Sequence, residues 1–315
     1  MASDNNRGIL FILVGMTLFS GQDVLIRQLS DGGSLLQVLT IRGVLGTIFL
    51  TIFLKLTGRP VIFSSAYPLL SAARIILFFF GFLAFYYALT VMNLAEVTAL
   101  FFASPLFITL ISKFILKESV GLPRTMAVII GFMGVLLIVK PTANTFNAIA
   151  LLPIFTAFAY AVSMLVARYT KDKDSIWQQM MHLYFGGAIF GAIGSVLMIL
   201  FAVNEASMPT AGYIVREWNL TDGYIISIMI CVAAIGCAGM LLLTYAYRLG
   251  APSVIAPFEY SLLFLAAAWG YFLFDEVPDT LSMWGMILIV NSSLFIFFRE
   301  NIRRRPVAIK TSLRT

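Results

Sequence analysis

Six ionisable side chains lie inside long apolar stretches of the sequence and are the first candidates for chemistry. A charged side chain at the centre of a membrane helix costs about 2.5–3.5 kcal/mol on insertion scales, so such residues usually have a function. Here they fall into two tiers, each one or two helical turns from the end of its apolar stretch. One tier is Asp23, Arg42 and Glu96, and the other is Arg74, His182 and Glu259.

The opposite charges within each tier suggest two ion pairs. We expect Asp23 to lie near Arg42, and Glu259 near Arg74, because a buried carboxylate needs a donor. The pairs are candidates for gate contacts, one closing as the other opens, and static pairing between helices is the alternative. If Glu259→Arg combined with Arg74→Glu restored full activity, a static pair would be favoured. Both arginines are also long enough to reach lipid headgroups instead.

The region between the two tiers is aromatic and nearly uncharged. Tyr86 lies there, and Tyr86 and Tyr260 are candidates for lining a substrate cavity. An apolar cavity with charged mouths suits a small amphiphile, such as an amino acid with an apolar side chain. A nucleotide or sugar phosphate would need a basic pocket at mid-depth instead. Histidine titrates near neutral pH, so His182 is a candidate proton relay, and a hydrogen-bonded structural histidine is the alternative.

The motifs of other functional classes are missing from the sequence. With one histidine and neither G-x-S-x-G nor H-E-x-x-H, it lacks the usual signatures of hydrolytic and metal catalysis. Cys231 and Cys237 lie six positions apart in one apolar stretch, a spacing that suits neither a metal site nor a disulfide. We therefore expect no enzymatic activity, no metal and no cofactor. A channel or receptor would show a selectivity ring or a large ligand domain, and neither is visible.

Prolines inside the apolar stretches predict breaks in two helices. Pro105 lies in the middle of one stretch and Pro257 near the start of another. Each removes one backbone hydrogen bond. In a membrane, such breaks are tolerated where they line a cavity or are buried by neighbouring helices. Both prolines are candidate hinges, and kinks without a functional role are the alternative.

The elements that must position these residues follow from composition. Of the 315 residues, 60% are hydrophobic and 11% are charged, and the mean hydropathy is +0.95. Runs such as IILFFFGFLAF do not alternate as the strands of a barrel do. The expected fold is therefore an all-α membrane protein with ten transmembrane helices. The segments long enough to span a bilayer are 8–29, 35–57, 68–91, 94–116, 124–140, 147–169, 175–203, 223–249, 253–274 and 280–298.

The basic residues predict the orientation. Most of the 21 Lys and Arg residues fall on one side if ten helices alternate from a cytoplasmic N-terminus. This is the positive-inside pattern, so we expect an N-in/C-in, multi-pass protein of the cell (inner) membrane. The basic tail, residues 299–315, directly follows a membrane helix. That position favours contact with lipid headgroups over binding to nucleic acid.

The two halves of the chain are related by a sparse repeat. Residues 81–118 align with 239–276 without a gap, at a shift of 158 positions. The charges next to the matches are reversed, with Lys117 opposite Asp275. Loops of opposite charge predict two halves that cross the membrane in opposite directions, as in many secondary transporters. We expect two five-helix units, residues 1–140 and 141–298, followed by the tail 299–315.

Two segments carry a resemblance to a known family: ALTVMNLAEVTALFFASPLFITLISKFILKE (88–118) and APFEYSLLFLAAAWGYFLFDEVPDTLSMWGMILIV (256–290). They resemble the paired repeats of the drug/metabolite transporter superfamily, EamA type. Its members end the fourth and ninth helices with an apolar residue followed by Glu, as Glu118 and Glu276 do here. The resemblance implies ten helices in two inverted five-helix repeats, a central substrate cavity and, usually, export of small metabolites.

We therefore predict a secondary transporter that exports amino acids or similar amphiphiles by alternating access. Its expected partners are a small-molecule substrate and the lipid bilayer. Carriers of nucleotide-type or sugar metabolites or of drugs are alternatives within the superfamily. A membrane channel or receptor is an alternative of a different class.

Two features allow two interpretations each. The stretch 204–222 is either an amphipathic lid or a slack connector. The small residues Gly131 and Gly134, and the pair Gly187-x3-Gly191, indicate either close contact between helices or dimerisation. Both a monomer and a homodimer fit the sequence.

Overall fold

A computed structural model describes residues 2–114, 122–140, 148–170, 172–203, 211–249 and 256–303, and all regular structure within these ranges is helical. The expectations for Lys117, Glu118 and the tail beyond residue 303 lie outside the described residues. The helices of the first half are α1 (Ala2–Gln28), η1 (Leu29–Asp31), α2 (Leu35–Leu56), α3 (Pro68–Val91), α4 (Leu94–Phe101), α5 (Ser104–Phe114) and α6 (Leu122–Val139). Those of the second half are η2 (Ala148–Ala150), α7 (Leu151–Thr170), α8 (Ile176–Leu200), α9 (Gly212–Val215), α10 (Gly223–Leu249), η4 (Ala256–Tyr260), α12 (Ser261–Phe274) and α13 (Thr280–Arg303).

Eight helical segments in the described part of the chain are long and apolar enough to cross a membrane. They are Asn6–Asp31, Leu35–Leu56, Pro68–Val91, Leu94–Ile111, Ala148–Thr170, Ile176–Leu200, Gly223–Ala246 and Thr280–Arg299. Two further apolar helices, Thr125–Val139 and Phe258–Phe274, are shorter. The all-helical membrane fold predicted from composition is therefore confirmed, while the number of ten spans stays a prediction.

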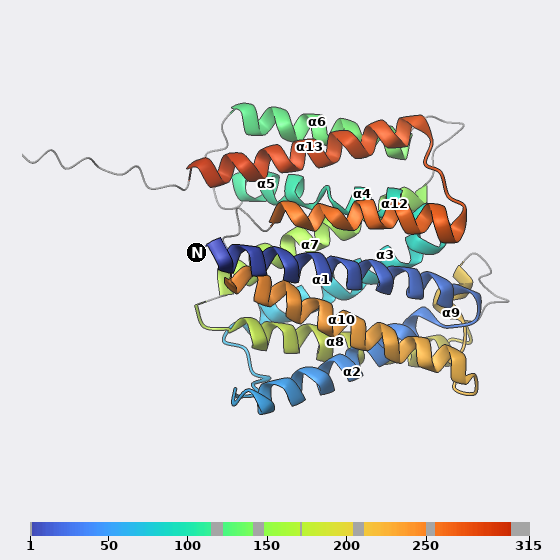
Figure 1. The fold of residues 1–315 in the computed structure, drawn as a ribbon. Coiled ribbons are helices and arrows are strands. Elements are labelled where there is room, and N and C mark those ends of the chain that lie inside the picture. The colour runs from blue at the N-terminus through green and yellow to red at the C-terminus, as the bar shows by residue number, and fades with distance from the viewer. Residues whose placement is uncertain are drawn as a thin grey trace, which may run out of the picture.

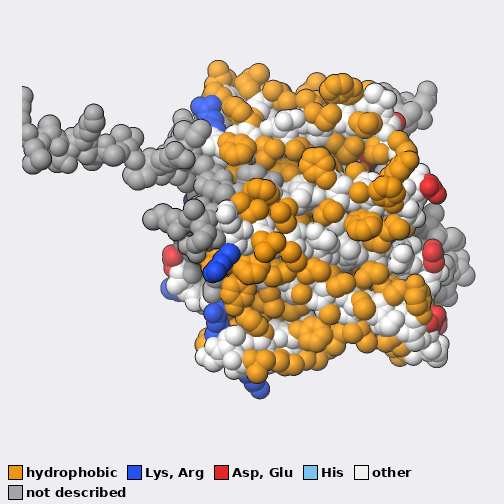
Figure 2. Space-filling model, viewed as in Figure 1, with side chains coloured by type: hydrophobic (Ala, Val, Ile, Leu, Met, Phe, Trp, Pro, Cys, Tyr) orange, Lys and Arg blue, Asp and Glu red, His pale blue; other side chains and the backbone are white. Residues whose placement is uncertain are grey.

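The long helices lie side by side in one bundle (Figure 1). α1 packs on α10, α3 on α7, α2 on α8, and α6 on α13, so most main contacts join one half of the chain to the other. Figure 2 shows apolar side chains covering the flank of the bundle. In that view Lys and Arg gather at the end where the N-terminus lies, and most acidic side chains at the opposite end.

Small residues make the closest of these contacts. A Cβ added at Gly134 would meet the carbonyl of Gly285 on α13, and one at Gly191 would meet Thr40 on α2. A Cβ at Gly131 would meet Leu106 and the Ser292 hydroxyl. These glycines therefore serve helix contacts within the chain. Gly187, by contrast, has open space beside it.

The predicted helix over 94–116 is divided in the structure. α4 ends at Phe101 and α5 begins at Ser104, one residue before Pro105. The amide of Leu106 bonds to the carbonyl of Ala103, which leaves the carbonyl of Phe102 without its usual helical partner. Ser293 on α13 donates its hydroxyl to that carbonyl at 3.1 Å. The proline thus breaks the helix, and a neighbouring helix satisfies the freed group.

A second irregularity lies in the segment predicted as a helix over 253–274. In the described part of that segment, residues 256–260 form the 3-10 helix η4, which contains Pro257, and the α-helix starts only at Ser261. Tyr260, the last residue of η4, stacks on Phe102 with ring centroids 4.6 Å apart. The two irregular points in the bundle are therefore in direct contact.

Candidate functional site

A polar cluster lies in the interior of the bundle, among α1, α2, α3 and α10. Gln22 and Asp23 on α1 are buried, and the Gln22 amide donates to the Tyr86 hydroxyl of α3 at 2.9 Å. Arg42 on α2 lies over two aromatic faces, with its guanidinium carbon 5.5 Å from the centroid of Phe82 and 5.8 Å from that of Tyr86. Asp23 lies within range of electrostatic attraction from Arg42. The expected proximity of Asp23 and Arg42 is thus present, although no ion pair joins them.

Two polar atoms of this cluster are buried without hydrogen-bond partners within the described part of the chain, namely the side-chain carboxamide oxygen of Gln22 and the Nε of Arg42. The hydroxyl of Ser20, one turn before Asp23 on α1, is also buried without a partner there. An unmade hydrogen bond in a protein interior costs about 1–3 kcal/mol. Buried donors and acceptors without partners, next to an acid, a base and aromatic faces, are therefore suited to a ligand that carries both charges.

α10 and α8 form the wall of this cluster. Gly236 on α10 lies so close that an added Cβ would meet the Gln22 carboxamide oxygen and, at 3.3 Å, the Nε of Arg42. Tyr184 on α8 is within hydrogen-bonding distance of the Gly236 carbonyl, at 3.5 Å, and of Cys237. The sequence reasoning missed Gln22, Tyr184 and Gly236 because uncharged residues do not stand out in an apolar stretch. The signal that could have found Gln22 is its position next to Asp23.

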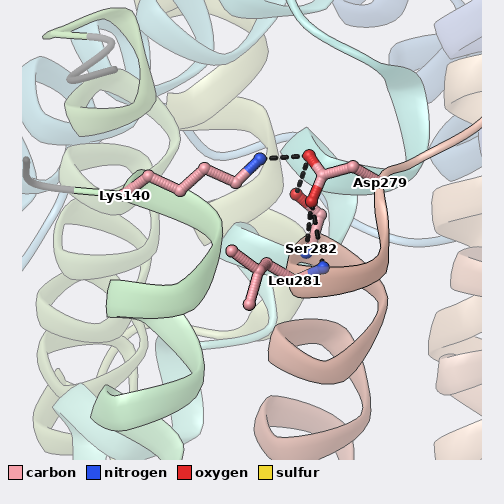
Figure 3. A network of polar contacts seen from close by, with 4 residues as sticks. All are labelled: Lys140, Asp279, Leu281 and Ser282. Atoms are coloured by element: carbon pink, nitrogen blue, oxygen red, sulfur yellow. Dashed lines mark hydrogen bonds and ion pairs between the residues drawn. The ribbon is translucent and has the colours of Figure 1, made fainter. Parts of the chain in front are cut away.

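Glu96 lies elsewhere, at the end of the bundle opposite the N-terminus. It is half-buried near the start of α4, within hydrogen-bonding reach of Ser282 and close to Lys140 and Asp279. Figure 3 shows Lys140, which directly follows α6, pointing at the carboxylate of Asp279, the residue directly before α13. The same carboxylate caps α13 by accepting the backbone amides of Leu281 and Ser282, at 3.0 and 3.1 Å.

A second ion pair strengthens this end of the bundle. Arg27, on α1, pairs with Glu276, which follows α12, and its guanidinium lies 4.2 Å from the centroid of the Phe274 ring. Glu276 also accepts the backbone amide of Leu94 at 2.9 Å. Leu94 is the first residue of α4, where an acidic side chain satisfies an orphan donor and complements the helix dipole. The signature Glu276 thus joins α1, α4 and α12.

The second tier of ionisable residues, which we call the inner tier, is organised around Arg74. Its Nε donates to the Ser163 hydroxyl at 3.1 Å, and a terminal nitrogen donates to the Gln179 side chain at 3.4 Å. Tyr160 lies within electrostatic range of both Arg74 and Glu259. The Arg74–Glu259 pair therefore stays a prediction, with Tyr160 as the residue near both.

The remaining candidates occupy separate places. Nε2 of His182 is 2.9 Å from the carbonyl of Phe63, in the segment between α2 and α3. This matches the structural alternative for His182. Tyr260 stacks on Phe102 at the break between α4 and α5 rather than joining the cluster of Asp23, Arg42 and Tyr86.

Comparisons with known proteins agree with this architecture. Residues 6–140 match the EamA-like transporter family. An S-adenosylmethionine uptake transporter of Rickettsia conorii is 26% identical over 293 residues, which cover 93% of each chain. A pseudopaline exporter of Pseudomonas aeruginosa is 22% identical over 284 residues, which cover 90% of this chain and 93% of the exporter. A crystal structure with 15% sequence identity superposes with a TM-score of 0.61, over 95% of this chain and 99% of that chain, which shows a shared fold.

The resemblance stated from the sequence is confirmed by these matches. The relatives are transporters rather than enzymes, and the apolar helices make the protein multi-pass in the inner membrane. Residues 6–140 are therefore an EamA-like transporter domain, and nearly the whole chain is similar to membrane transporters.

Proposed function

We propose that the protein is a secondary transporter of small zwitterionic amphiphiles, namely amino acids or compounds that contain an amino-acid group. The observation that carries this proposal is the buried cluster of Asp23 and Arg42 beside Tyr86, with its unpartnered polar atoms. Arg42 would hold a substrate carboxylate, and Asp23 a substrate ammonium group. The faces of Phe82 and Tyr86 would take its apolar or aromatic part.

The relatives support an amino-acid-type substrate. S-adenosylmethionine, named for the Rickettsia transporter, carries a carboxylate and an ammonium group on one carbon, together with an aromatic base. A ligand of this kind matches both the opposite charges of the cluster and its aromatic faces. S-adenosylmethionine is therefore the second candidate substrate after the free amino acids. The named relatives include both an uptake and an export protein, so the proposal covers both directions of transport.

We also propose that the chain forms ten spans in two inverted five-helix repeats, residues 1–140 and 141–298, with both termini in the cytoplasm. Three features support this. If each helix is replaced by its equivalent in the other repeat, the contact of α1 with α10 becomes the contact of α7 with α3. The contacts of α2 with α8 and of α6 with α13 are each unchanged by this replacement, because their members are equivalents of each other. Phe102 and Tyr260, which are 158 positions apart, stack on each other at the two helix irregularities. The basic side chains gather at the end of the N-terminus (Figure 2).

Alternating access would then follow from movement of one half against the other. The Asp23–Arg42 tier and the Arg74–Tyr160–Glu259 tier lie on two sides of the aromatic interior, and we propose them as gates. If Glu259→Arg combined with Arg74→Glu transports as well as the native protein, the inner tier is a static pair instead.

The proposal is tested by counterflow into proteoliposomes. Purified protein is reconstituted with internal unlabelled methionine or S-adenosylmethionine, and uptake of labelled solute is measured with and without a pH gradient. We expect saturable exchange that other amino acids inhibit and that Asp23→Asn reduces at least about tenfold, because a charge-assisted contact is worth about 1.5–3 kcal/mol.

Three outcomes would contradict it. Flux that does not saturate would indicate a channel. Failure of both amino acids and S-adenosylmethionine to exchange would show that the substrate class is wrong. An equal loss in Asp174→Asn, a buried acid that bonds Ser65 and the Ala66 amide away from the cluster, would make the effect of Asp23→Asn a general one.

A further inference from the structure

A short segment of the second half lies folded over the end of α1. Residues 211–219, which we call the strap, comprise α9 and the extended residues that follow it. In Figure 1, α9 lies at the end of the bundle opposite the N-terminus, beside the end of α1. Within the strap, Tyr213 and Val215 are buried. The strap therefore packs as part of the protein interior.

The strap bonds to carbonyls at the end of α1 and directly after it. The Tyr213 hydroxyl donates to the Ile26 carbonyl at 3.0 Å. One terminal nitrogen of Arg216 donates to the carbonyls of Ser30 and Gly33, at 2.8 and 3.1 Å. Carbonyls at a helix C-terminus lack partners in their own helix, and a cation there also complements the dipole. The strap thus supplies the cap that the end of α1 needs.

The strap is bound to α2 as well. The amide of Gln37 donates to the Asn219 carbonyl at 2.9 Å, and its carbonyl oxygen accepts the Asn219 amide at 3.0 Å. Within the second half of the chain, the Trp218 indole donates to the Ser195 hydroxyl of α8 at 2.9 Å. The strap is therefore anchored in the second half by Trp218 and bonded to the first half by Tyr213, Arg216 and Asn219.

This bridge lies directly beyond the polar cluster. Ile26, which accepts the Tyr213 hydroxyl, is three residues after Asp23, or about 5 Å along the helix. Tyr213 also lies within electrostatic range of Tyr86. A ligand that entered from this end of the bundle would have to pass between the strap and the ends of α1 and α2.

We propose that the strap is a lid over the substrate site, which closes access from the outer side by holding α1 and α2 against α8 and α10. Opening to that side breaks the bonds of Tyr213, Arg216 and Asn219 to the first half while Trp218 stays on α8. The lid rests on the proposed transport function, because it guards the same site.

The native Cys237 allows a test that needs no substrate. Its side chain is buried on α10, beside Tyr184 and within electrostatic range of Arg42, so it reports access to the cluster. Cys231 is exposed and is removed by Cys231→Ser. The measurement is the rate at which a membrane-impermeant thiol reagent, added to the outside of spheroplasts, alkylates Cys237 in the full-length protein.

We expect Tyr213→Phe and Arg216→Gln each to raise this rate about fivefold, because each removes bonds that hold the lid closed. Trp218→Phe is the matched control, since it removes a bond within the second half and should leave the rate within about twofold. Tyr213→Phe removes a single oxygen and carries the test if Arg216→Gln does not accumulate.

Two results would overturn the lid. One is an unchanged rate in Tyr213→Phe, and the other is an equal rise in Trp218→Phe, which would indicate general loosening of the loop. If Cys237 becomes accessible as expected but no amino acid or S-adenosylmethionine exchanges, the lid stands and the substrate proposal fails.

Discussion

Arg42 is the residue whose surroundings say most about transport. It is held over Phe82 and Tyr86, it lies near Asp23, and its Nε has no partner in the described part of the chain. A buried donor nitrogen without a partner is costly unless a ligand accepts its hydrogen bond. The planar guanidinium can stack on aromatic faces and at the same time bind a substrate carboxylate through two parallel hydrogen bonds.

Replacing Arg42 by lysine should therefore weaken substrate binding. Lysine keeps the charge but loses the planar face and the Nε donor, so we expect KM for counterflow to rise about tenfold. Arg59→Lys is the matched control, because Arg59 also lies over an aromatic ring, that of Trp177, 4.6 Å away and outside the cluster. Equal changes in KM for the two variants would show that Arg42 does not contact substrate.

Gly236 permits the close approach of Gln22 and Arg42 to α10. In Gly236→Ala the new methyl group would displace the ends of both side chains, so we expect at least about a tenfold loss of exchange. Gly187→Ala, in a helix with open space beside it, should keep exchange and gain about 0.5–1 kcal/mol of stability. Counterflow and thermal unfolding in detergent measure the two effects, and normal exchange in Gly236→Ala would remove the cluster from the transport path.

At the scale of elements, the break between α4 and α5 is the feature most suited to movement. Pro105 has no amide to donate to the Phe101 carbonyl. The Leu106 amide bonds to Ala103 instead of Phe102, and Ser293 holds the Phe102 carbonyl through a single side-chain bond. A break in which one side-chain hydroxyl satisfies the carbonyl is easier to rearrange than a continuous helix with all its backbone bonds. The stacking of Phe102 on Tyr260 transmits any change to the start of α12.

Restoring the backbone donor at this break should therefore slow transport. In Pro105→Ala the new amide can bond within the helix, which favours a continuous α4–α5 and should lower the maximal exchange rate about fivefold at unchanged or higher thermal stability. Pro153→Ala is the control, since Pro153 lies in the first turn of α7, where proline is tolerated, and exchange should stay unchanged. A fall in stability together with exchange in Pro105→Ala would show that the proline is needed only for the fold.

At the scale of the whole molecule, charged side chains join the two halves at the end opposite the N-terminus. Glu276 contributes twice, as the partner of Arg27 and as the acceptor for the first amide of α4. The two roles differ, because only the first is an ion pair between side chains. If Glu276 did nothing but pair with Arg27, the protein would tolerate swapping the two charges.

Reversal of both charges should for this reason fail. Arg27→Glu combined with Glu276→Arg restores a pair but leaves the Leu94 amide without an acceptor and places a cation at a helix N-terminus. We expect the double variant to unfold in detergent at a lower temperature than the native protein, with a loss of about 1–3 kcal/mol. Glu276→Gln, which keeps an acceptor for the amide, should lose less, and full stability of the double variant would contradict the capping role.

Acid should weaken the link between the ends of α6 and α13. The hydrogen bond from Lys140 lowers the pKa of the Asp279 carboxyl below its ordinary value. A lowered pKa in the folded state means that this link contributes stability above the ordinary carboxyl pKa and loses it as the pH falls through the lowered value. Because Asp279 is half-exposed, we expect a contribution under about 1 kcal/mol.

The measurement is thermal unfolding in detergent as a function of pH. Lys140→Ala should be less stable than the native protein at neutral pH, and the difference should shrink as the pH is taken below the carboxyl range. A difference that stays constant at low pH would show that Lys140 acts through contacts other than Asp279.

The sequence by itself determined the class of the molecule and most of its elements. Apolar runs of spanning length and the scarcity of charge predicted the helical membrane fold, because a backbone in lipid must satisfy its own hydrogen bonds. Local chemistry also predicted the break at Pro105. Depth along each helix placed Asp23 near Arg42, since depth follows directly from residue number.

Only the tertiary structure decided which faces meet and which groups lack partners. Gln22, Tyr184 and Gly236 joined the cluster because α1, α8 and α10 turn those faces toward one another, and rotation about a helix axis is weakly marked in an almost wholly apolar sequence. For the same reason, only the structure shows that Arg74 bonds to Ser163 and Gln179, and that His182 bonds to the Phe63 carbonyl. The strap binds backbone carbonyls that lack a hydrogen-bond partner because α1 ends there. The donors that reach them come from residues 183 to 187 positions away in the chain, so only the folded structure brings them together.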